Sequence, residues 1–157
     1  MKLFHTADWH LGKVLYGRSL LDDQRYFLYD FFLPLIDREK PDGILLSGDI
    51  FDRQIAPVEA ISLFDRIITE IVVKRNTPFL ISLGNHDGAD RFSLGTDLLK
   101  TKGLHIETKL KSTVEPVRIM KDGVKTHIYM LPYFDPAVAR DAFKNETLRT
   151  YAESFEA

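Results

Sequence analysis

The sequence has no cysteine among its 157 residues, which excludes a disulfide framework and any metal site built from thiolates. A metal ion would have to be held by imidazole and oxygen ligands, a donor set that suits manganese, magnesium, iron or zinc. No stretch of 18 apolar residues occurs, so the sequence predicts no membrane-spanning helix. The first residues lack the apolar segment of a signal peptide, and we expect a cytoplasmic protein.

An excess of charge of one sign is also lacking. The formal net charge is −2, so overall electrostatics neither indicate nor exclude a nucleic-acid partner. Binding to a phosphate backbone would need a local cluster of Lys and Arg. The length, with 45% hydrophobic and 28% charged residues, is typical of one globular domain with its own core.

Short apolar runs alternate with amphipathic segments through the first part of the chain. Residues 2–6, 44–46 and 79–81 are predicted to be strands, and the last two are apolar enough to be buried on both faces. Helical periodicity covers residues 19–39 and 57–75 between them. Strand–helix–strand units of this kind predict an α/β fold with a mostly parallel sheet and right-handed crossovers.

The two helical segments carry different irregularities. In the first, Pro34 removes a backbone donor, so we expect a kink or two shorter helices. In the second, Leu63 and Ile67 widen the apolar arc, which indicates either a contact with a partner or a helix held between two layers. The expected buried residues are Leu28, Phe31, Phe32, Leu35 and Ile36 in the first segment and Ile61, Phe64, Ile68, Ile71 and Val72 in the second.

A different pattern follows residue 103. A short helix is expected over 97–102, and the Asp122-Gly123 pair predicts a hairpin between strands at 114–120 and 126–131. A helical tail is expected from Asp135 onward. Its predicted apolar face consists of Leu148, Tyr151, Ala152 and Phe155.

A polar cluster directly follows each of the three predicted buried strands. The clusters are Asp8-Trp9-His10, Gly48-Asp49-Ile50-Phe51-Asp52 and Gly84-Asn85-His86-Asp87. Because ligands bind beyond the carboxyl ends of parallel strands, we expect these side chains to form one site. Each string alone also occurs in ordinary turns and helix caps, whereas all three in this order favour a metal site. His5 lies inside the first strand and is expected to be a packed core residue.

The cluster residues suit two-metal hydrolysis of a phosphate ester. Two ions lower the pKa of a bound water and neutralise the phosphoryl oxygens. Asp8 and His10 are the candidate ligands of one ion, and the amide oxygen of Asn85 is that of the other. Asp49 is the candidate bridge, because a carboxylate has two oxygens. His86 is the candidate general acid for the leaving oxygen.

These strings resemble the first three motifs of the calcineurin-like metallophosphoesterase superfamily. The longer stretches 5–12, 48–53 and 131–136 are similar to the SbcD family of DNA-repair nuclease subunits. The resemblance implies a layered αββα sandwich, of which residues 1–157 supply the N-terminal part. It further implies two divalent ions, Mn²⁺ or alternatively Mg²⁺, a homodimer, and an SMC-like ATPase partner of the SbcC type. The implied activities are 3'-5' exonuclease action on duplex DNA and endonuclease action on single strands or hairpins, in repair and recombination.

By that resemblance, metal ligation falls to Asp8, His10, Asp49 and Asn85, and leaving-group protonation to His86. Archaeal relatives carry a histidine at the position of Asp52, so the role of Asp52 stays open. The family completes its site with a further His and a Gly-His-x-His motif. The remaining histidines, His105 and His127, lie in no such string, so we expect an incomplete metal shell, from either a fragment or a truncated protein.

Four loop residues near the clusters are candidates for DNA contacts: Lys13, Tyr16, Arg18 and Arg53. The alternative is that they are ordinary solvated loop residues. Two rival functions also stay open, a different phosphatase or phosphodiesterase of the superfamily, and a non-catalytic chain that only dimerises or docks a partner. The expected dimer contact is the helix over 57–75 together with Leu98 and Leu99.

Overall fold

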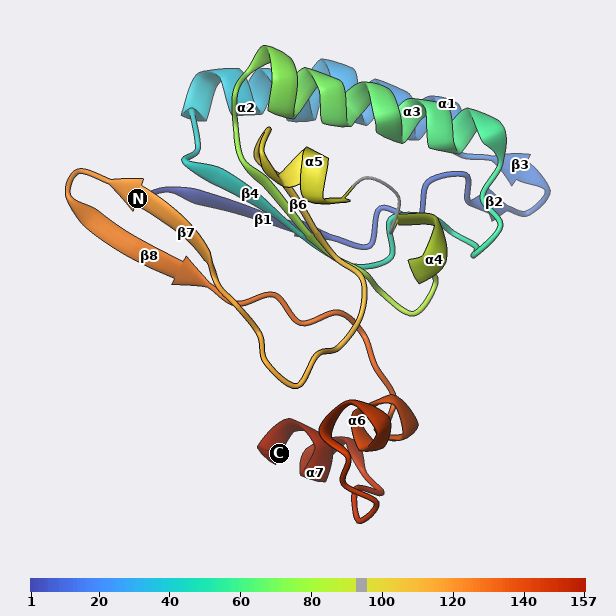
Figure 1. Cartoon of the computed structure of the whole chain (residues 1–157). Helices are drawn as coiled ribbons and strands as arrows, with labels where there is room; N and C mark the ends of the chain where they lie inside the picture. Colours follow the sequence, from blue (N-terminus) through green and yellow to red (C-terminus); the bar gives the residue numbers. More distant parts are fainter. Residues whose placement is uncertain (93–95) are drawn as a thin grey trace.

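Four parallel strands form the central sheet in the computed structural model, which describes residues 1–92 and 96–157 (Figure 1). The strand order is β1-β4-β5-β6, and all neighbouring pairs are parallel. The strands are β1 Leu3–Ala7, β4 Gly43–Ser47, β5 Phe79–Ser82 and β6 Leu104–Glu107. The first three confirm the predicted strand–helix–strand arrangement. The fourth, β6, was not predicted, because four residues of alternating apolar and polar character give too short a pattern.

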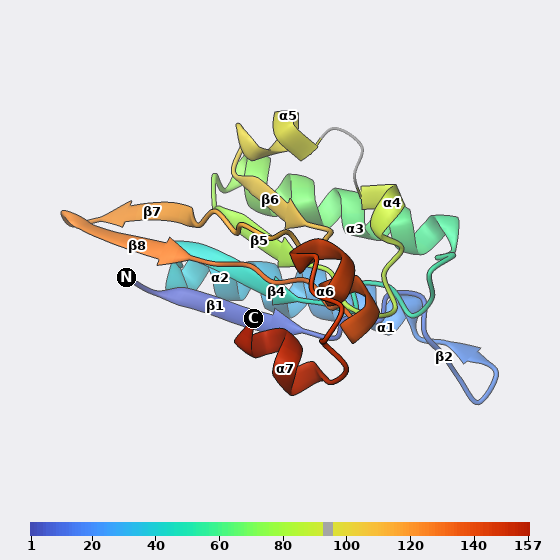
Figure 2. The ribbon, with the colours of Figure 1, turned by 60° about the horizontal axis from the view of Figure 1, so that its bottom comes forward.

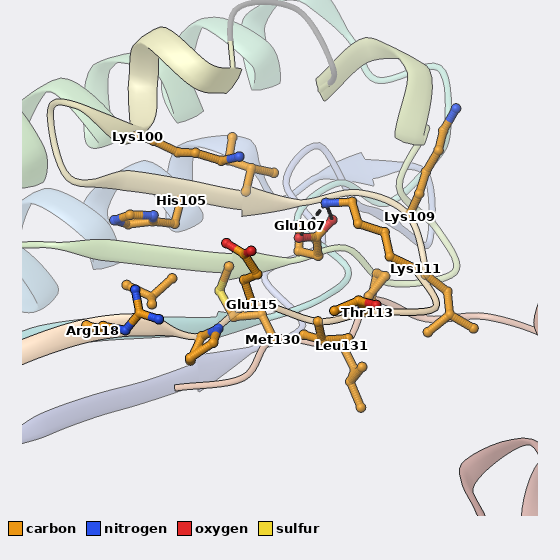
Figure 3. A pocket seen from close by; sticks show the side chains of 16 residues that line it. Lys100, His105, Glu107, Lys109, Lys111, Thr113, Glu115, Arg118, Met130 and Leu131 are labelled. Atoms are coloured by element: carbon orange, nitrogen blue, oxygen red, sulfur yellow. Dashed lines mark hydrogen bonds and ion pairs between the residues drawn. The ribbon is translucent and has the colours of Figure 1, made fainter. Parts of the chain in front are cut away.

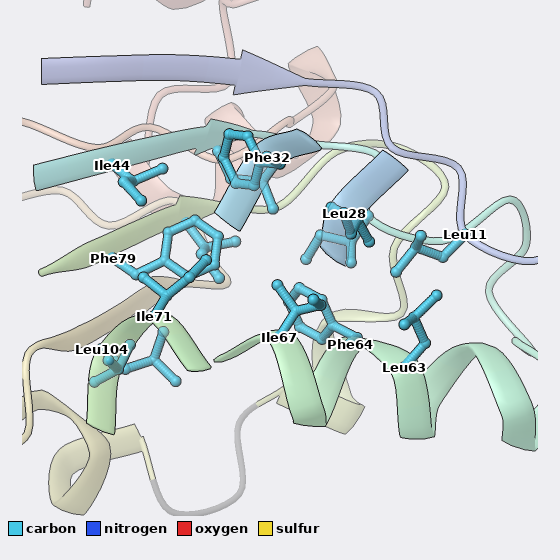
Figure 4. Packing of buried hydrophobic residues seen from close by; sticks show 14 of the residues in the cluster. Leu11, Leu28, Phe32, Ile44, Leu63, Phe64, Ile67, Ile71, Phe79 and Leu104 are labelled. Carbon is cyan, nitrogen blue, oxygen red and sulfur yellow. The ribbon is translucent and has the colours of Figure 1, made fainter. Parts of the chain in front are cut away.

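Helices cover one face of this sheet, as Figure 1 shows. The covering segments are α1 Leu21–Tyr26, the π-helical turn η1 Phe27–Phe32, α2 Leu33–Glu39, α3 Val58–Ile68, the π-helical turn η2 Thr69–Lys74, and the short helices α4 Ala89–Phe92 and α5 Thr96–Lys100. The main core lies between the helices and the sheet, where Phe32 and Phe64 face Ile44 and Phe79 (Figure 4). Burial of this apolar surface is the main force that holds the layers together.

The long helical segment α3–η2 turns most of its predicted face inward, and Phe64, Ile71 and Val72 are buried as predicted. Leu63 and Ile67 are fully buried in the core, so the wide apolar arc is explained by packing within the chain. Ile61, predicted to be buried, is 41% exposed, and that prediction was wrong. The π-helical turn at the end of the segment shifts the phase between its two parts, so Ile71 and Val72 still face the core.

A π-helical turn also accommodates Pro34 in the first helical segment. The N–H of Leu33 bonds to the carbonyl of Leu28, five residues back, and α2 then restarts with Pro34 in its first turn. A missing N–H is tolerated in the first turn of a helix. The wider turn rotates the chain, so Leu33 is buried whereas Phe31 is exposed, and the prediction for Phe31 was wrong.

The opposite face of the sheet is less covered. The predicted hairpin is confirmed as β7 Val117–Lys121 and β8 Val124–Ile128. It lies on this side together with α6 Pro136–Phe143 and α7 Tyr151–Glu156 (Figures 1 and 2). His5 points to this side, is exposed, and hydrogen-bonds to Ser47 at 2.9 Å, so its predicted place in the core was wrong.

The helical tail has only a small core of its own. Leu148 is buried with Phe134 and Ala139. Tyr151 and Phe155, predicted to belong to a packed apolar face, are 48% and 65% exposed. The tail therefore forms as predicted, and its predicted apolar face meets only this small core, where the Phe155 ring lies 5.1 Å from that of Phe134.

Arg75 ties the two helical segments of the covering layer together. Its guanidinium bonds to both oxygens of Asp37 at 2.8 and 2.9 Å and to Glu70 at 2.8 Å. The hydrogen bond from Arg75 lowers the pKa of Asp37, and those from Lys74 and then Arg75 lower the pKa of Glu70. Carboxyl groups with lowered folded pKa values stabilise the fold above their unfolded pKa, and this stabilisation is lost as the pH falls through the folded pKa.

An Arg75→Met variant should therefore melt at a lower temperature than the parent chain at neutral pH, and the gap should close in acid. The closing is expected as the pH falls below the ordinary values of 3.8 and 4.5 for these carboxyl groups. Thermal unfolding followed by circular dichroism at several pH values measures it. Arg25→Met, which removes only an exposed pair with Asp22, serves as the control. A gap that persists unchanged in acid would contradict the assignment.

Candidate metal centre

The chain turns sharply where β1 and β4 end, and three candidate ligands lie in these turns. Asp8, His10 and Asp49 have φ values of 54°, 42° and 51°, in the left-handed region that non-glycine residues seldom adopt. Such backbone conformations cost on the order of 1–3 kcal/mol each and concentrate at functional sites. Two backbone hydrogen bonds join these turns. The N–H of Asp8 donates to the carbonyl of Gly48 at 3.1 Å, and the N–H of His10 donates to the carbonyl of Asp49 at 2.9 Å.

The side chains of these three residues converge. His10 Nε2 lies 3.8 Å from Asp8 Oδ1 and 3.7 Å from Asp49 Oδ2, and the three ligand atoms all lie within 4.8 Å of one another. Bonds from nitrogen or oxygen to a divalent ion measure about 2.0–2.2 Å, so ligands 3.7–3.8 Å apart can share one ion. The donor set of two carboxylates and one imidazole also suits such an ion.

The third cluster adjoins the second through Asp49. A Cβ atom added at Gly84 would collide with the Asp49 carboxylate, so only glycine permits this approach. The N–H of His86 donates to Asp49 Oδ1 at 3.1 Å. Asn85, between these two residues, is exposed at the same turn. The structure thus brings all three predicted clusters to one edge of the sheet.

The His86 ring is fixed through one nitrogen. Its Nδ1–H donates to the carbonyl oxygen of Asp52 at 2.9 Å, which leaves Nε2 available for a second proton. This hydrogen bond, followed by the negative charges of Asp49 and Asp52, raises the pKa of His86. A raised pKa favours the imidazolium form that a general acid needs.

The profile of the Calcineurin-like phosphoesterase family matches residues 1–149. This chain belongs to the calcineurin-like phosphoesterase family. It is also 34% identical over 154 residues to the SbcD subunit of the SbcCD nuclease from Staphylococcus epidermidis, an alignment that covers 98% of this chain and 40% of that relative. The predicted resemblance is confirmed, and the parallel sheet agrees with a metallophosphoesterase α/β fold.

Calcineurin-like phosphoesterases use divalent metal ions, and Asp8, His10 and Asp49 are the residues of this family member that could hold one. Among the side chains that the structure describes, no other group of three or more His, Asp or Glu ligands meets the same geometry. His105 lies apart from this group and lines a cavity of about 510 Å³ beneath β6 (Figure 3). Burial of its ring, and then the positive charge of Lys100, lower the pKa of His105.

No helix within the described ranges is long and apolar enough to cross a membrane.

Asp87 of this phosphoesterase is a structural centre of the site that sequence patterns did not reveal. Its carboxylate is only 7% exposed and accepts hydrogen bonds from the N–H groups of Gly84 at 2.9 Å, Ile50 at 3.0 Å and Phe51 at 3.2 Å. Burial raises the pKa of Asp87, although these three hydrogen bonds oppose the rise. One carboxylate therefore fixes the turn after β5 to the turn after β4.

Gln24 of α1 bonds to the turn that follows β1, and no sequence signal points to this role of Gln24. Its Oε1 accepts from the N–H of Gly12 at 3.0 Å, and its Nε2 donates to the carbonyls of Trp9 at 3.0 Å and His10 at 2.9 Å. The Trp9 ring packs edge-on against Phe32 in the core, with centroids 5.7 Å apart. Trp9 therefore anchors the turn to the core and does not line the metal site.

The four candidate DNA contacts divide into two pairs. Tyr16, 97% exposed, and Arg18 lie at the tip of a projecting hairpin formed by β2 Val14–Leu15 and β3 Arg18–Ser19 (Figure 2). Lys13 Nζ instead bonds to Asp52 Oδ1 at 3.1 Å, and Arg53 Nε lies 3.8 Å from Asp52 Oδ2. The charge of Lys13 is thus directed at the site, whereas the hairpin tip points to solvent.

Proposed function

We propose that residues 1–157 are the N-terminal part of the nuclease domain of a metal-dependent DNA nuclease. The observation that carries the proposal is the convergence of Asp8, His10 and Asp49, with His10 Nε2 3.8 and 3.7 Å from the two carboxylates. Membership of a phosphoesterase family gives the reaction class. The chain spans 40% of the length of the curated relative it matches, so the activity belongs to a longer assembly of residues.

Each side chain takes a defined part in this proposal. Asp8 and His10 would hold one Mn²⁺ or Mg²⁺ ion, Asn85 would offer its amide oxygen to a second, and Asp49 would serve as a shared ligand. The ions, when bound, acidify a water molecule and neutralise the phosphoryl oxygens. His86 donates a proton from Nε2 to the leaving oxygen, while the Asp52 carbonyl holds its Nδ1 at 2.9 Å.

Two features support a nucleic-acid substrate. The hairpin tip with Tyr16 and Arg18 supplies an aromatic ring and a cation, which suit contacts to bases and phosphates. The relative's name, that of a nuclease component, supports the same substrate class.

The finer activity and partners follow the same resemblance. We assign 3'-5' exonuclease action on duplex ends and endonuclease action on single strands or hairpins, in cytoplasmic DNA repair and recombination with an SMC-like ATPase of the SbcC type. A homodimer is proposed through α3 and α5, where Val58, Ile61 and Leu98 are exposed, with Ile55 exposed in the loop before α3. Ile61 also lines an apolar groove of about 260 Å³, together with Phe64 and Leu99.

The substrate class is tested by comparing three substrates with the protein made from the complete reading frame. We expect linear duplex and hairpin DNA to be degraded in Mn²⁺ and left intact in EDTA, with p-nitrophenyl phosphate turned over far more slowly. Rapid hydrolysis of the small ester without DNA cleavage would favour another phosphatase or phosphodiesterase of the family. No hydrolysis of any substrate by a metal-loaded dimer would favour a chain that only docks a partner.

A further inference from the structure

One residue, Asp52, contacts both imidazoles of the candidate site. Its carbonyl oxygen accepts from His86 Nδ1 at 2.9 Å, and its carboxylate Oδ1 lies 3.7 Å from His10 Nδ1. The two imidazole rings are perpendicular, with centroids 5.1 Å apart. Asp52 therefore lies behind both rings, on the side of their Nδ1 atoms.

His10 Nδ1 lacks a hydrogen-bond acceptor in the described part of the chain, and the carboxylate of Asp52 is placed to supply one. The atom is buried and makes no hydrogen bond within residues 1–92 and 96–157. Its ring partner Nε2 faces Asp8 and Asp49. A neutral imidazole that ligates a metal through Nε2 must carry its proton on Nδ1, and that N–H is normally given to a carboxylate or carbonyl.

Lys13 holds the Asp52 carboxylate in place through an ion pair. Its ammonium bonds to the same oxygen, Oδ1, at 3.1 Å, while the Asp52 side chain is only 16% exposed. Burying a carboxylate to this extent would be costly without a cation beside it. Lys13 offsets that cost and restricts the rotation of the Asp52 side chain.

We infer that Asp52 is a positioning residue that sets the tautomers of His10 and His86, with Lys13 fixing its carboxylate. The side chain draws the His10 proton to Nδ1 and so presents Nε2 to the metal. The backbone carbonyl keeps the first proton of His86 on Nδ1, so Nε2 is the nitrogen that takes up a second proton and can give it to the leaving oxygen. This inference rests on the proposed metal site for its purpose, but the tautomers exist in the metal-free protein and can be observed there.

The two contacts come from different parts of Asp52, so one substitution separates them. Asp52→Ala removes the carboxylate and keeps the carbonyl, and ¹H–¹⁵N correlation spectra of the five histidines report each tautomer without metal. We expect His10 to lose its preference for Nδ1–H, while His86 retains its own. Mn²⁺ affinity, measured by calorimetry, should fall by about 10–100-fold, the usual effect of removing a carboxylate behind a ligating histidine.

Matched variants separate positioning from loss of charge or fold. Asp52→Asn removes the charge but keeps an acceptor oxygen, so it should retain the His10 tautomer and lose less affinity than Asp52→Ala. Asp30→Ala removes an exposed carboxylate elsewhere and should change neither measurement. Thermal unfolding of each variant confirms that it is folded.

The inference is overturned if His10 keeps its proton on Nδ1 in Asp52→Ala, even when Mn²⁺ binds more weakly, because the effect is then one of charge alone. Failure of the proposed function looks different. In that case the parent chain binds no Mn²⁺, while the tautomers of the metal-free protein still report whether Asp52 orients His10.

Discussion

Replacing Asp49 by asparagine is expected to lower both Mn²⁺ affinity and phosphodiester hydrolysis by at least about 100-fold, since even residues behind metal ligands cost 10–100-fold. The substitution removes the negative charge at the point where all three clusters meet. Asp49 lies 3.7 Å from His10 Nε2 and accepts from the N–H of His86 at 3.1 Å. An amide can accept one of these contacts but cannot join two cations through two charged oxygens.

Calorimetric titration with Mn²⁺ measures the first effect in this chain, and degradation of linear duplex DNA measures the second in the protein from the complete reading frame. Asp30→Asn, on the exposed side of η1, is the control for loss of one negative charge. Hydrolysis that survives the Asp49→Asn substitution at the parent rate would refute the bridging role of Asp49.

Replacing Asp87 by alanine is expected to destabilise the fold by about 3–5 kcal/mol, the usual cost of leaving buried hydrogen-bonding partners unpaired. In the parent chain, the N–H groups of Gly84, Ile50 and Phe51 share one buried carboxylate. The substitution leaves all three without this acceptor. It also frees the two ligand-bearing turns from each other, so Mn²⁺ affinity should fall in variants that still fold.

Urea unfolding of the parent chain and of two Asp87 variants measures this cost. Asp87→Asn retains one acceptor oxygen and should lose less stability than Asp87→Ala. Equal stability of the parent chain and the alanine variant would show that the three N–H groups find other partners, contrary to the role assigned to Asp87.

The sequence predicted the parts of the fold that depend on local pattern. Apolar runs ending in polar clusters indicated β1, β4 and β5 and the edge where the site forms, and the Asp-Gly pair indicated the β7–β8 hairpin. The error at Phe31 arose where the helical period changes. The π-helical turn η1 adds a residue to a turn, and a constant period cannot anticipate it.

The supporting contacts of the site could not be predicted, because they depend on which loops meet in space. Asp87 and Gln24 belong to segments whose local pattern suits a turn and a helix, and their roles arise from backbone groups up to 37 and 15 residues away. Lys13 was predicted as a DNA contact from its place in a loop. Only the folded chain shows that it bonds to Asp52 at 3.1 Å. His5 was misplaced because a short strand does not reveal which of its faces is covered.

Paramagnetic broadening by Mn²⁺ tests the central claim, that the three strand-end clusters form one metal site, most directly. Substoichiometric Mn²⁺ added to the ¹⁵N-labelled chain should first broaden the amide signals of residues 8–10, 49–52 and 84–87 together. Signals near His105 and His127 should persist. Broadening centred on another acidic surface, or broadening of one cluster without the other two, would contradict a shared site.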